Sequence, residues 1–309
     1  MKVLGIESTA HTFGIGIVDE NYNILEDRRV AYKPKEGIVP MEAAEFHIKN
    51  IDKLTKGIDF SEIDLIGVTN GPGLPPCLRV GIEFSKKLSE KLKKPLIGVN
   101  HCQAHIEIGK ILCCTKNPIV LYVSGGNTQV IYYNQGYKIL GETQDIGLGN
   151  ALDKLGRVVG LEFPAGPKIE KLAKKGKFII LPYSVKGMDL NFSGILSEAI
   201  RKINKGINVE DILFSFQEIC FSMLAEVCER AMAATEINEL LVVGGVAQNK
   251  RLQEILRIMC IERGAKFYAV PKEYSSDNGV MIAMTALKNW IEGKKYKVEI
   301  KPNWRIDML

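Results

Sequence analysis

The chain has 309 residues, of which 46% are hydrophobic and 25% charged, and its formal net charge is +5. This is the composition of a globular protein, and it excludes a disordered or fibrous chain. The length corresponds to two domains or one large domain. The small positive charge permits a nucleic-acid partner without requiring one.

The longest apolar runs have the length of strands and fall far short of the roughly 18 residues that a membrane span needs. Glu7 interrupts the first apolar stretch, so we expect no signal peptide. The seven cysteines contain no C-x-x-C pair, a pattern typical of free thiols in a reducing compartment. We therefore expect a cytoplasmic protein that does not bind membranes.

In chain order, the first elements are an antiparallel meander with strands at residues 3–6, 13–18 and 24–25. An amphipathic helix follows over 40–57, with proline near its start and glycine at its end. We expect its inward face to consist of Met41, Ala44, Ile48, Ile51 and Leu54. A strand at 64–68, a helix ending in the lysine-rich stretch 86–94 and a strand at 95–99 complete this half.

The same order returns with strands at 119–123, 128–133 and 137–140, and then with a strand at 239–243, a helix ending at 263 and a strand at 266–270. Between them, 149–206 predicts several short helices and 209–235 a long core helix. This repetition predicts an α/β fold built by internal duplication. We expect subdomains at 1–115, with a helical insertion at about 34–57, and at 116–309, with one at about 145–206; the extreme C-terminus would pack on the first.

Two histidines, His101 and His105, stand four residues apart. On a helix this spacing puts both imidazoles on one face, where they can bind one metal ion. The alternative is two unrelated surface histidines. A zincin protease would need glutamate directly after the first histidine, and Cys102 stands there, so a metallopeptidase is disfavoured.

The duplication suggests a third ligand. The second-half strand that matches the one before His101 is followed by Asp277. If the halves face each other, Asp277 reaches the histidines from the opposite wall. Two histidines and one carboxylate leave coordination positions open, as in catalytic metal sites. The alternative role of Asp277 is that of a helix N-cap, and the two roles are compatible.

Two glycine-rich turns occupy matching places: 124–128, with Gly125 and Gly126, and 244–249. Glycine lets backbone N–H groups approach an anion closely. Neither turn fits the P-loop or Rossmann pattern. One such turn is a weak signal, but two in equivalent places indicate a nucleotide site.

An ordered set of motifs extends over the whole chain. It consists of Leu4-Gly5-Ile6-Glu7-Ser8-Thr9, Gly71-Pro72-Gly73, His101-x-x-x-His105, Tyr122-Val123-Ser124-Gly125-Gly126-Asn127-Thr128-Gln129, Gly141-Glu142-Thr143, Asn150-Ala151-Leu152-Asp153-Lys154, Phe192-Ser193-Gly194, Gly244-Gly245-Val246-Ala247-Gln248-Asn249 and Ser276-Asp277-Asn278-Gly279-Val280-Met281-Ile282-Ala283. In this the chain resembles the universal tRNA threonylcarbamoyl transferase family, in its archaeal and eukaryotic branch. That family includes the catalytic subunit of the KEOPS complex.

The resemblance implies an actin-like ATPase (ASKHA) fold with two RNase H-like subdomains facing a cleft. It implies that His101, His105, Asp277 and Tyr122 bind one divalent metal ion, iron or zinc, through which the first three act in catalysis. It also implies an adenylate site formed by Tyr122, Val123, Ser124, Gly125, Gly126, Asp153, Gly166, Glu170 and Asn249.

The activity implied is transfer of a threonylcarbamoyl group from its adenylate to the adenine next to the anticodon, in tRNAs that read codons beginning with A. The implied partners are tRNA, a small atypical protein kinase and other KEOPS-type subunits. Two alternatives stay open: a non-metal actin-like ATPase or kinase, and a nucleotide-binding scaffold without catalysis.

Overall fold

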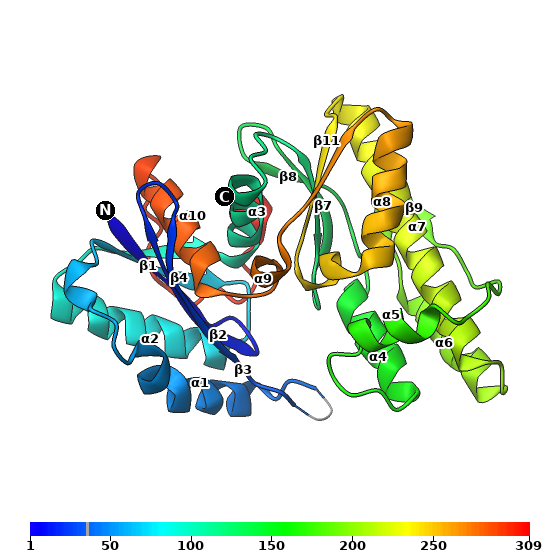
Figure 1. Cartoon of the computed structure of the whole chain (residues 1–309), viewed down its shortest axis with the longest axis horizontal. Coiled ribbons are helices and arrows are strands. Elements are labelled where there is room, and N and C mark those ends of the chain that lie inside the picture. Colours follow the sequence, from blue (N-terminus) through cyan, green and yellow to red (C-terminus); the bar gives the residue numbers. More distant parts are fainter. Residues whose placement is uncertain (35–36) are drawn as a thin grey trace. The chain divides into compact units, whose positions relative to one another are not determined.

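The computed structural model describes residues 1–34 and 37–309, which form an α/β chain with two five-stranded sheets (Figure 1). Residues 35 and 36, at the start of the insertion expected at about 34–57, lie outside the described residues. The chain divides into two compact units: Met1–Leu112 with Ser276–Leu309, and Cys113–Ser275. No helix within the described ranges is long and apolar enough to cross a membrane.

The first unit contains a sheet of spatial order β3-β2-β1-β4-β5. Its strands are β1 (Lys2–Glu7), β2 (Thr12–Asp19), β3 (Ile24–Ala31), β4 (Leu65–Gly71) and β5 (Leu96–Asn100). Its α-helices are α1 (Pro40–Thr55), α2 (Pro75–Leu92), α3 (His101–Leu112) and α10 (Gly279–Ile291). Figure 1 shows α1 and α2 on one face of this sheet and α10 on the other, so its central strands are buried on both faces.

The second unit contains a sheet of spatial order β12-β11-β6-β7-β8. The strands of that sheet are β6 (Ile119–Val123), β7 (Thr128–Tyr133), β8 (Tyr137–Glu142), β11 (Glu239–Val243) and β12 (Lys266–Ala269), and a separate two-stranded sheet is formed by β9 (Val185–Lys186) and β10 (Asp189–Leu190). Its helices are α4 (Leu148–Val158), α5 (Gly166–Ala173), α6 (Ser193–Asn204), α7 (Val209–Thr235), the 3₁₀ helix η2 (Gly245–Gln248), α8 (Lys250–Glu262) and α9 (Lys272–Ser275).

The two large sheets have the same topology. In each, the first strand is central, pairs antiparallel with the second, and pairs parallel with the fourth. The fifth strand adds parallel to the fourth. The second sheet therefore has the same strand order and pairing as the first, with β6, β7, β8, β11 and β12 equivalent to β1, β2, β3, β4 and β5. This confirms the predicted duplication.

The insertion expected at about 145–206 contains α4, α5 and α6, and the long helix α7 packs against α5, α6 and α8. Most of α7 is buried, so the core helix predicted at 209–235 is confirmed.

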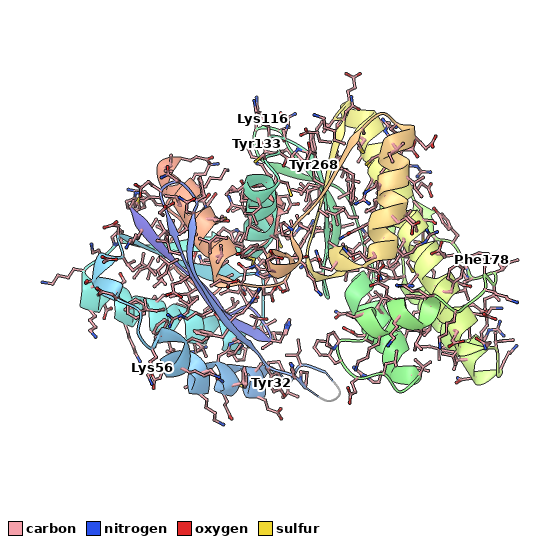
Figure 2. All side chains as sticks on the ribbon, viewed as in Figure 1. Tyr32, Lys56, Lys116, Tyr133, Phe178 and Tyr268 are labelled. Carbon is pink, nitrogen blue, oxygen red and sulfur yellow. The ribbon has the colours of Figure 1, made fainter. Side chains whose placement is uncertain are left out.

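Between α5 and β9, the side chain of Phe178 is 57% exposed and points away from the ribbon (Figure 2).

Helix α1 begins at Pro40 as predicted, but its buried face differs from the prediction. Met41 and Ile48 are 61% and 59% exposed. Ala44 and Leu54 are buried as predicted, Ile51 is half-buried against the core, and Ala43 and His47 are buried as well. Helix α1 packs against α2, and the centroid of the His47 ring lies 5.5 Å from that of Phe13. The apolar periodicity alone did not show which side would meet the sheet.

The expected boundary assigned 116–309 to the second subdomain, with only the extreme C-terminus packing on the first, whereas the first unit includes everything from Ser276 onward, helix α10 among it. The reason is a close backbone contact. A Cβ atom built on Gly5 would lie 2.2 Å from the backbone of Ala283, and one on Gly16 would lie 2.2 Å from the backbone of Val280. Glycine at these positions lets α10 lie directly on β1 and β2, so residues from Ser276 onward return to the N-terminal sheet.

The segment after α10 is hydrogen-bonded to β4 and β5. Asn70 Nδ2 donates to the carbonyl oxygen of Lys297 at 2.7 Å, and Asn100 Nδ2 donates to that of Trp304 at 2.9 Å. Both asparagine side chains are buried, so these bonds replace lost hydration. The C-terminal segment thus stabilises the strand that precedes His101.

We expect Gly16→Ala to lower the free energy of unfolding by about 1–3 kcal/mol, because its methyl group would overlap the α10 backbone. The matched control is Gly194→Ala, since a Cβ at Gly194 meets no atom within 4 Å and alanine favours a helix. Urea unfolding of both variants measures the difference. Equal stability of the two variants would contradict the packing argument.

Candidate functional site

Three side chains meet where parallel strands of the first sheet end. Strands β1, β4 and β5 run parallel, so their carboxyl ends share one edge. Glu7 is the last residue of β1, Thr69 lies near the end of β4, and His101 directly follows β5. Asn100 Oδ1 accepts a hydrogen bond from the N–H of Gln103 at 3.0 Å. That bond caps α3, so the helix begins at His101.

His101 and His105 lie on successive turns of α3, with their ring centroids 4.7 Å apart. Asp277 Oδ1 lies 3.2 Å from His105 Nε2 and 3.6 Å from His101 Nε2. One candidate ligand atom from each of the three residues lies within 4.8 Å of the others. Two imidazole nitrogens and one carboxylate oxygen match the donor sets of catalytic zinc and non-haem iron sites, so these residues fit a metal ion.

Two expectations about Asp277 were wrong. The N-cap of α10 is Asn278, whose Oδ1 accepts from the N–H of Met281 at 2.8 Å, so Asp277 does not cap the helix. Asp277 also belongs to the same compact unit as the histidines instead of reaching them from the opposite half. Helix α10 packs directly on Gly5 and Gly16. This contact places Asp277, the residue before the N-cap, near the end of β1 and in the same unit as the histidines.

The carboxylates set the protonation of this cluster. Burial disfavours a charged His101, but Glu7 and Asp277 outweigh that effect and raise the pKa of His101 to about 9. Burial lowers the pKa of His105. Burial alone would raise the pKa of Asp277, yet the hydrogen bond with His105 and the charge on His101 hold it well below its ordinary value. At neutral pH the cluster therefore contains an ionised Asp277 beside a protonated His101.

The sequence motifs assign Glu7 no role in this site, but its contacts place it there. Its side chain is fully buried, and its carboxylate lies 3.2 Å from His101 Nδ1. The carboxylate also accepts hydrogen bonds from Thr9 N–H and Thr69 Oγ1, each at 2.7 Å, and from Thr9 Oγ1. One feature of the sequence could have indicated this role: Glu7 stands at the end of an otherwise apolar strand, and a buried carboxylate needs hydrogen-bonding or charged partners.

In the second unit, the turn at Ser124–Asn127 rests on the start of α4. The N–H groups of Gly149 and Asn150 donate to the carbonyl oxygens of Ser124 and Gly125, at 3.1 and 2.9 Å. With the carbonyls turned toward α4, the N–H groups of Gly125 and Gly126 have no acceptor among the described residues. A Cβ on Gly126 would meet nothing within 4 Å, so the turn can admit an anion.

The second glycine pair lies beside the end of β6. Gly244 has φ +96°, and a Cβ there would lie 2.4 Å from the carbonyl oxygen of Val123. The fully buried ring of Tyr122 lies 3.3 Å from the same point. Because β6 and β11 are parallel neighbours, their carboxyl ends bring both glycine turns to one edge of the sheet. The second unit thus assembles Tyr122–Gly126 with Gly244.

The remaining predicted adenylate contacts surround the starts of α5 and α8. Asp153 accepts a hydrogen bond from the N–H of Ala165 at 2.7 Å, which holds the turn before Gly166. Glu170 Oε1 accepts from the N–H of Lys250 at 2.9 Å. Asn249 Oδ1 caps α8, and its Nδ2 donates to Gln217 at 2.8 Å. These side chains fix the backbone of the site.

We expect metal binding to strengthen by about tenfold per pH unit from about pH 7 to about pH 9, because the metal must displace one proton from His101. In the metal-free protein, protonated His101 stabilises the fold fully below pH 6.5, and this contribution is lost as the pH rises through about 9. Calorimetric Zn²⁺ titrations in buffers of different ionisation enthalpy measure the released proton. Binding without proton release at pH 7 would show that His101 is already neutral.

The comparisons with known proteins agree with each other. Residues 22–284 match the family model for tRNA N6-adenosine threonylcarbamoyltransferase. The chain is 51% identical over 317 residues to the tRNA N6-adenosine threonylcarbamoyltransferase of Archaeoglobus fulgidus, covering 99% of this chain and 98% of that protein. It is 49% identical to a probable bifunctional tRNA threonylcarbamoyladenosine biosynthesis protein of Methanocaldococcus jannaschii, covering 100% of this chain and 60% of that longer protein.

Among solved structures, HypF of T. kodakarensis aligns with a TM-score of 0.68 at 16% identity, over 95% of this chain and 48% of HypF. This likeness concerns the fold alone, which is the expected actin-like ATPase fold. The family model covers most of the chain, and the relative from A. fulgidus matches nearly all of it. The chain therefore belongs to the TsaD family of tRNA N6-adenosine threonylcarbamoyltransferases, as its motifs predicted.

Proposed function

We propose that this protein transfers the threonylcarbamoyl group of threonylcarbamoyl-adenylate to the exocyclic amine of the adenine next to the anticodon, in tRNAs reading codons that begin with A. The observation that supports this most is the buried cluster of His101, His105 and Asp277, whose ligand atoms lie within 4.8 Å of one another. A scaffold without catalysis has no need for such a cluster in a chain about half identical to a named transferase.

His101, His105 and Asp277 would hold one divalent ion, iron or zinc, with Tyr122 of the second unit as the fourth ligand that the family resemblance implies. When bound, such an ion acts as a Lewis acid on a carbonyl or phosphate oxygen. Asp277 is ionised, because its pKa is held well below its ordinary value, and it is therefore ready to bind a cation.

The adenylate would lie on the second unit. The N–H groups of Gly125 and Gly126 are suited to bind its phosphate, and the open space at Gly126 allows the phosphate to approach the backbone. Gly166 follows the turn that Asp153 holds, and it likewise leaves room for the adenosine. Glu170 and Asn249 support this surface by fixing the start of α8.

In the transfer, the amine nitrogen of the tRNA adenine forms a bond to the carbamoyl carbon, and the bond from that carbon to the phosphate oxygen breaks. AMP leaves with the electron pair, and the amine loses one proton. Negative charge grows on the departing phosphate, where the two glycine N–H groups would stabilise it. We infer direct attack by the amine, since no nucleophile–base–acid triad is evident in the sequence.

The partners we propose are tRNA, a small atypical protein kinase and other KEOPS-type subunits, in the cytoplasm. A net charge of +5 over 309 residues is modest for a protein that neutralises many tRNA phosphates. We infer that other subunits contribute much of the tRNA affinity.

We expect His101→Ala and His105→Ala to reduce both metal content and threonylcarbamoyl transfer by at least about 100-fold, because each removes a ligand. The control is His47→Leu, a buried histidine of the same unit on α1. Elemental analysis and an assay with adenylate, unmodified tRNA and partner subunits provide the two readouts. Full transfer by both metal-free variants would favour a non-metal ATPase, kinase or scaffold.

We expect Gly126→Val to leave the free energy of unfolding unchanged and to raise the KM for the adenylate by at least about tenfold. Its Cβ would lie more than 4 Å from any protein atom beyond its two chain neighbours, in the open space that the phosphate would occupy. Thermal unfolding and the KM measurement separate the two effects. An unchanged KM would place the phosphate elsewhere.

A further inference from the structure

We propose that Glu7 is a positioning residue that fixes the tautomer of His101, so that Nε2 of the neutral ring is the atom offered to a metal ion. This inference rests on the metal site proposed for His101, His105 and Asp277, and it gives a role to Glu7, which is not one of those ligands. The evidence is the set of atoms that face the two ring nitrogens of His101.

The two ring nitrogens of His101 face different carboxylates. Nδ1 lies 3.2 Å from Glu7 Oε2, while Nε2 lies 3.6 Å from Asp277 Oδ1 on the other side. An ionised carboxylate can only accept hydrogen bonds, so the nitrogen beside Glu7 must carry a hydrogen. In a neutral imidazole that leaves the lone pair on Nε2, the atom that faces Asp277 and His105.

Glu7 is itself held in one orientation. Its Oε1 accepts from the backbone N–H of Thr9 at 2.7 Å and from the Thr9 hydroxyl, and its Oε2 accepts from Thr69 Oγ1 at 2.7 Å. The side chain is fully buried at the end of a central strand. Such a carboxylate behind a ligating histidine fixes the ring and strengthens the ligand.

The bonds to Thr9 make one substitution especially informative. In Glu7→Gln, the backbone N–H of Thr9 can only donate, so the amide oxygen must take the place of Oε1. The amide NH₂ then takes the place of Oε2 and donates toward His101 Nδ1. That bond requires a lone pair on Nδ1 and moves the ring hydrogen to Nε2. A nearly isosteric change would therefore weaken metal binding, because coordination through Nε2 would require the hydrogen to return to Nδ1, opposite the amide NH₂.

The experiment measures Zn²⁺ affinity by chelator competition in the full chain, for the wild type, Glu7→Gln, Glu107→Gln and Thr69→Val. Glu107→Gln is the matched control, since Glu107 is also a buried carboxylate, on α3, but contacts Lys110 and Lys288 instead of a histidine. We expect Glu7→Gln to weaken Zn²⁺ binding by about 10- to 100-fold and Thr69→Val to weaken it less. Glu107→Gln should bind Zn²⁺ like the wild type.

A second readout observes the tautomer of His101 directly. In the Zn²⁺-bound wild type, ¹⁵N-edited NMR of the imidazoles should show a hydrogen on His101 Nδ1 and the metal on Nε2. In metal-free Glu7→Gln the hydrogen should appear on Nε2. A purely structural role for Glu7 would change thermal stability but not the tautomer.

The outcomes separate the two proposals. If the wild type binds no Zn²⁺, the metal site fails and this inference fails with it. If the wild type binds Zn²⁺ and folded Glu7→Gln binds it equally well, the role of Glu7 is overturned while the metal site stands. Coordination of the metal through Nδ1 of His101 would overturn the role of Glu7 in the same way.

Discussion

The direct contact between the α10 backbone and the glycines of β1 and β2 places Asp277 beside His101 and His105. Any side chain at Gly5 or Gly16 would overlap α10. With α10 seated there, Asn278 caps the helix, and Asp277 stands next to the two histidines. Asp277 thereby lies at the carboxyl edge of the N-terminal sheet, although the whole second unit separates it in sequence from the strands of that sheet.

That edge concentrates negative charge in a buried place. Glu7 and Asp277 flank His101 from opposite sides of its ring. Two buried carboxylates are costly unless a cation lies between them, which is why the pKa of His101 rises to about 9. A proton serves this role in the metal-free protein, and a divalent ion would replace it. The same charges that stabilise the protonated ring would also stabilise the divalent ion proposed for this site.

The candidate binding groups of the second unit are backbone N–H groups, whereas those of the first unit are side chains. Its glycine turns lie at the carboxyl edge of the duplicated sheet, and the start of α4 orients one of them. Asp153, Glu170 and Asn249 are engaged with backbone N–H groups, so they shape the surface. The two units share one topology but present different chemical groups. The first presents imidazole and carboxylate groups that suit a metal ion, and the second presents backbone N–H groups that suit an anion.

Several features could be predicted from the sequence because local patterns encode them. Strands β6, β7 and β11 have the predicted bounds, and the spacing of His101 and His105 sufficed to place both on one helical face. The motifs also identified the family. The burial of Ala43 and His47 in α1, with Met41 and Ile48 exposed, could not be predicted, nor could the unit to which Asp277 belongs or the bonds of Glu7 to Thr69 and His101. Each depends on contacts between residues distant in sequence, and only the tertiary structure decides which distant surfaces meet.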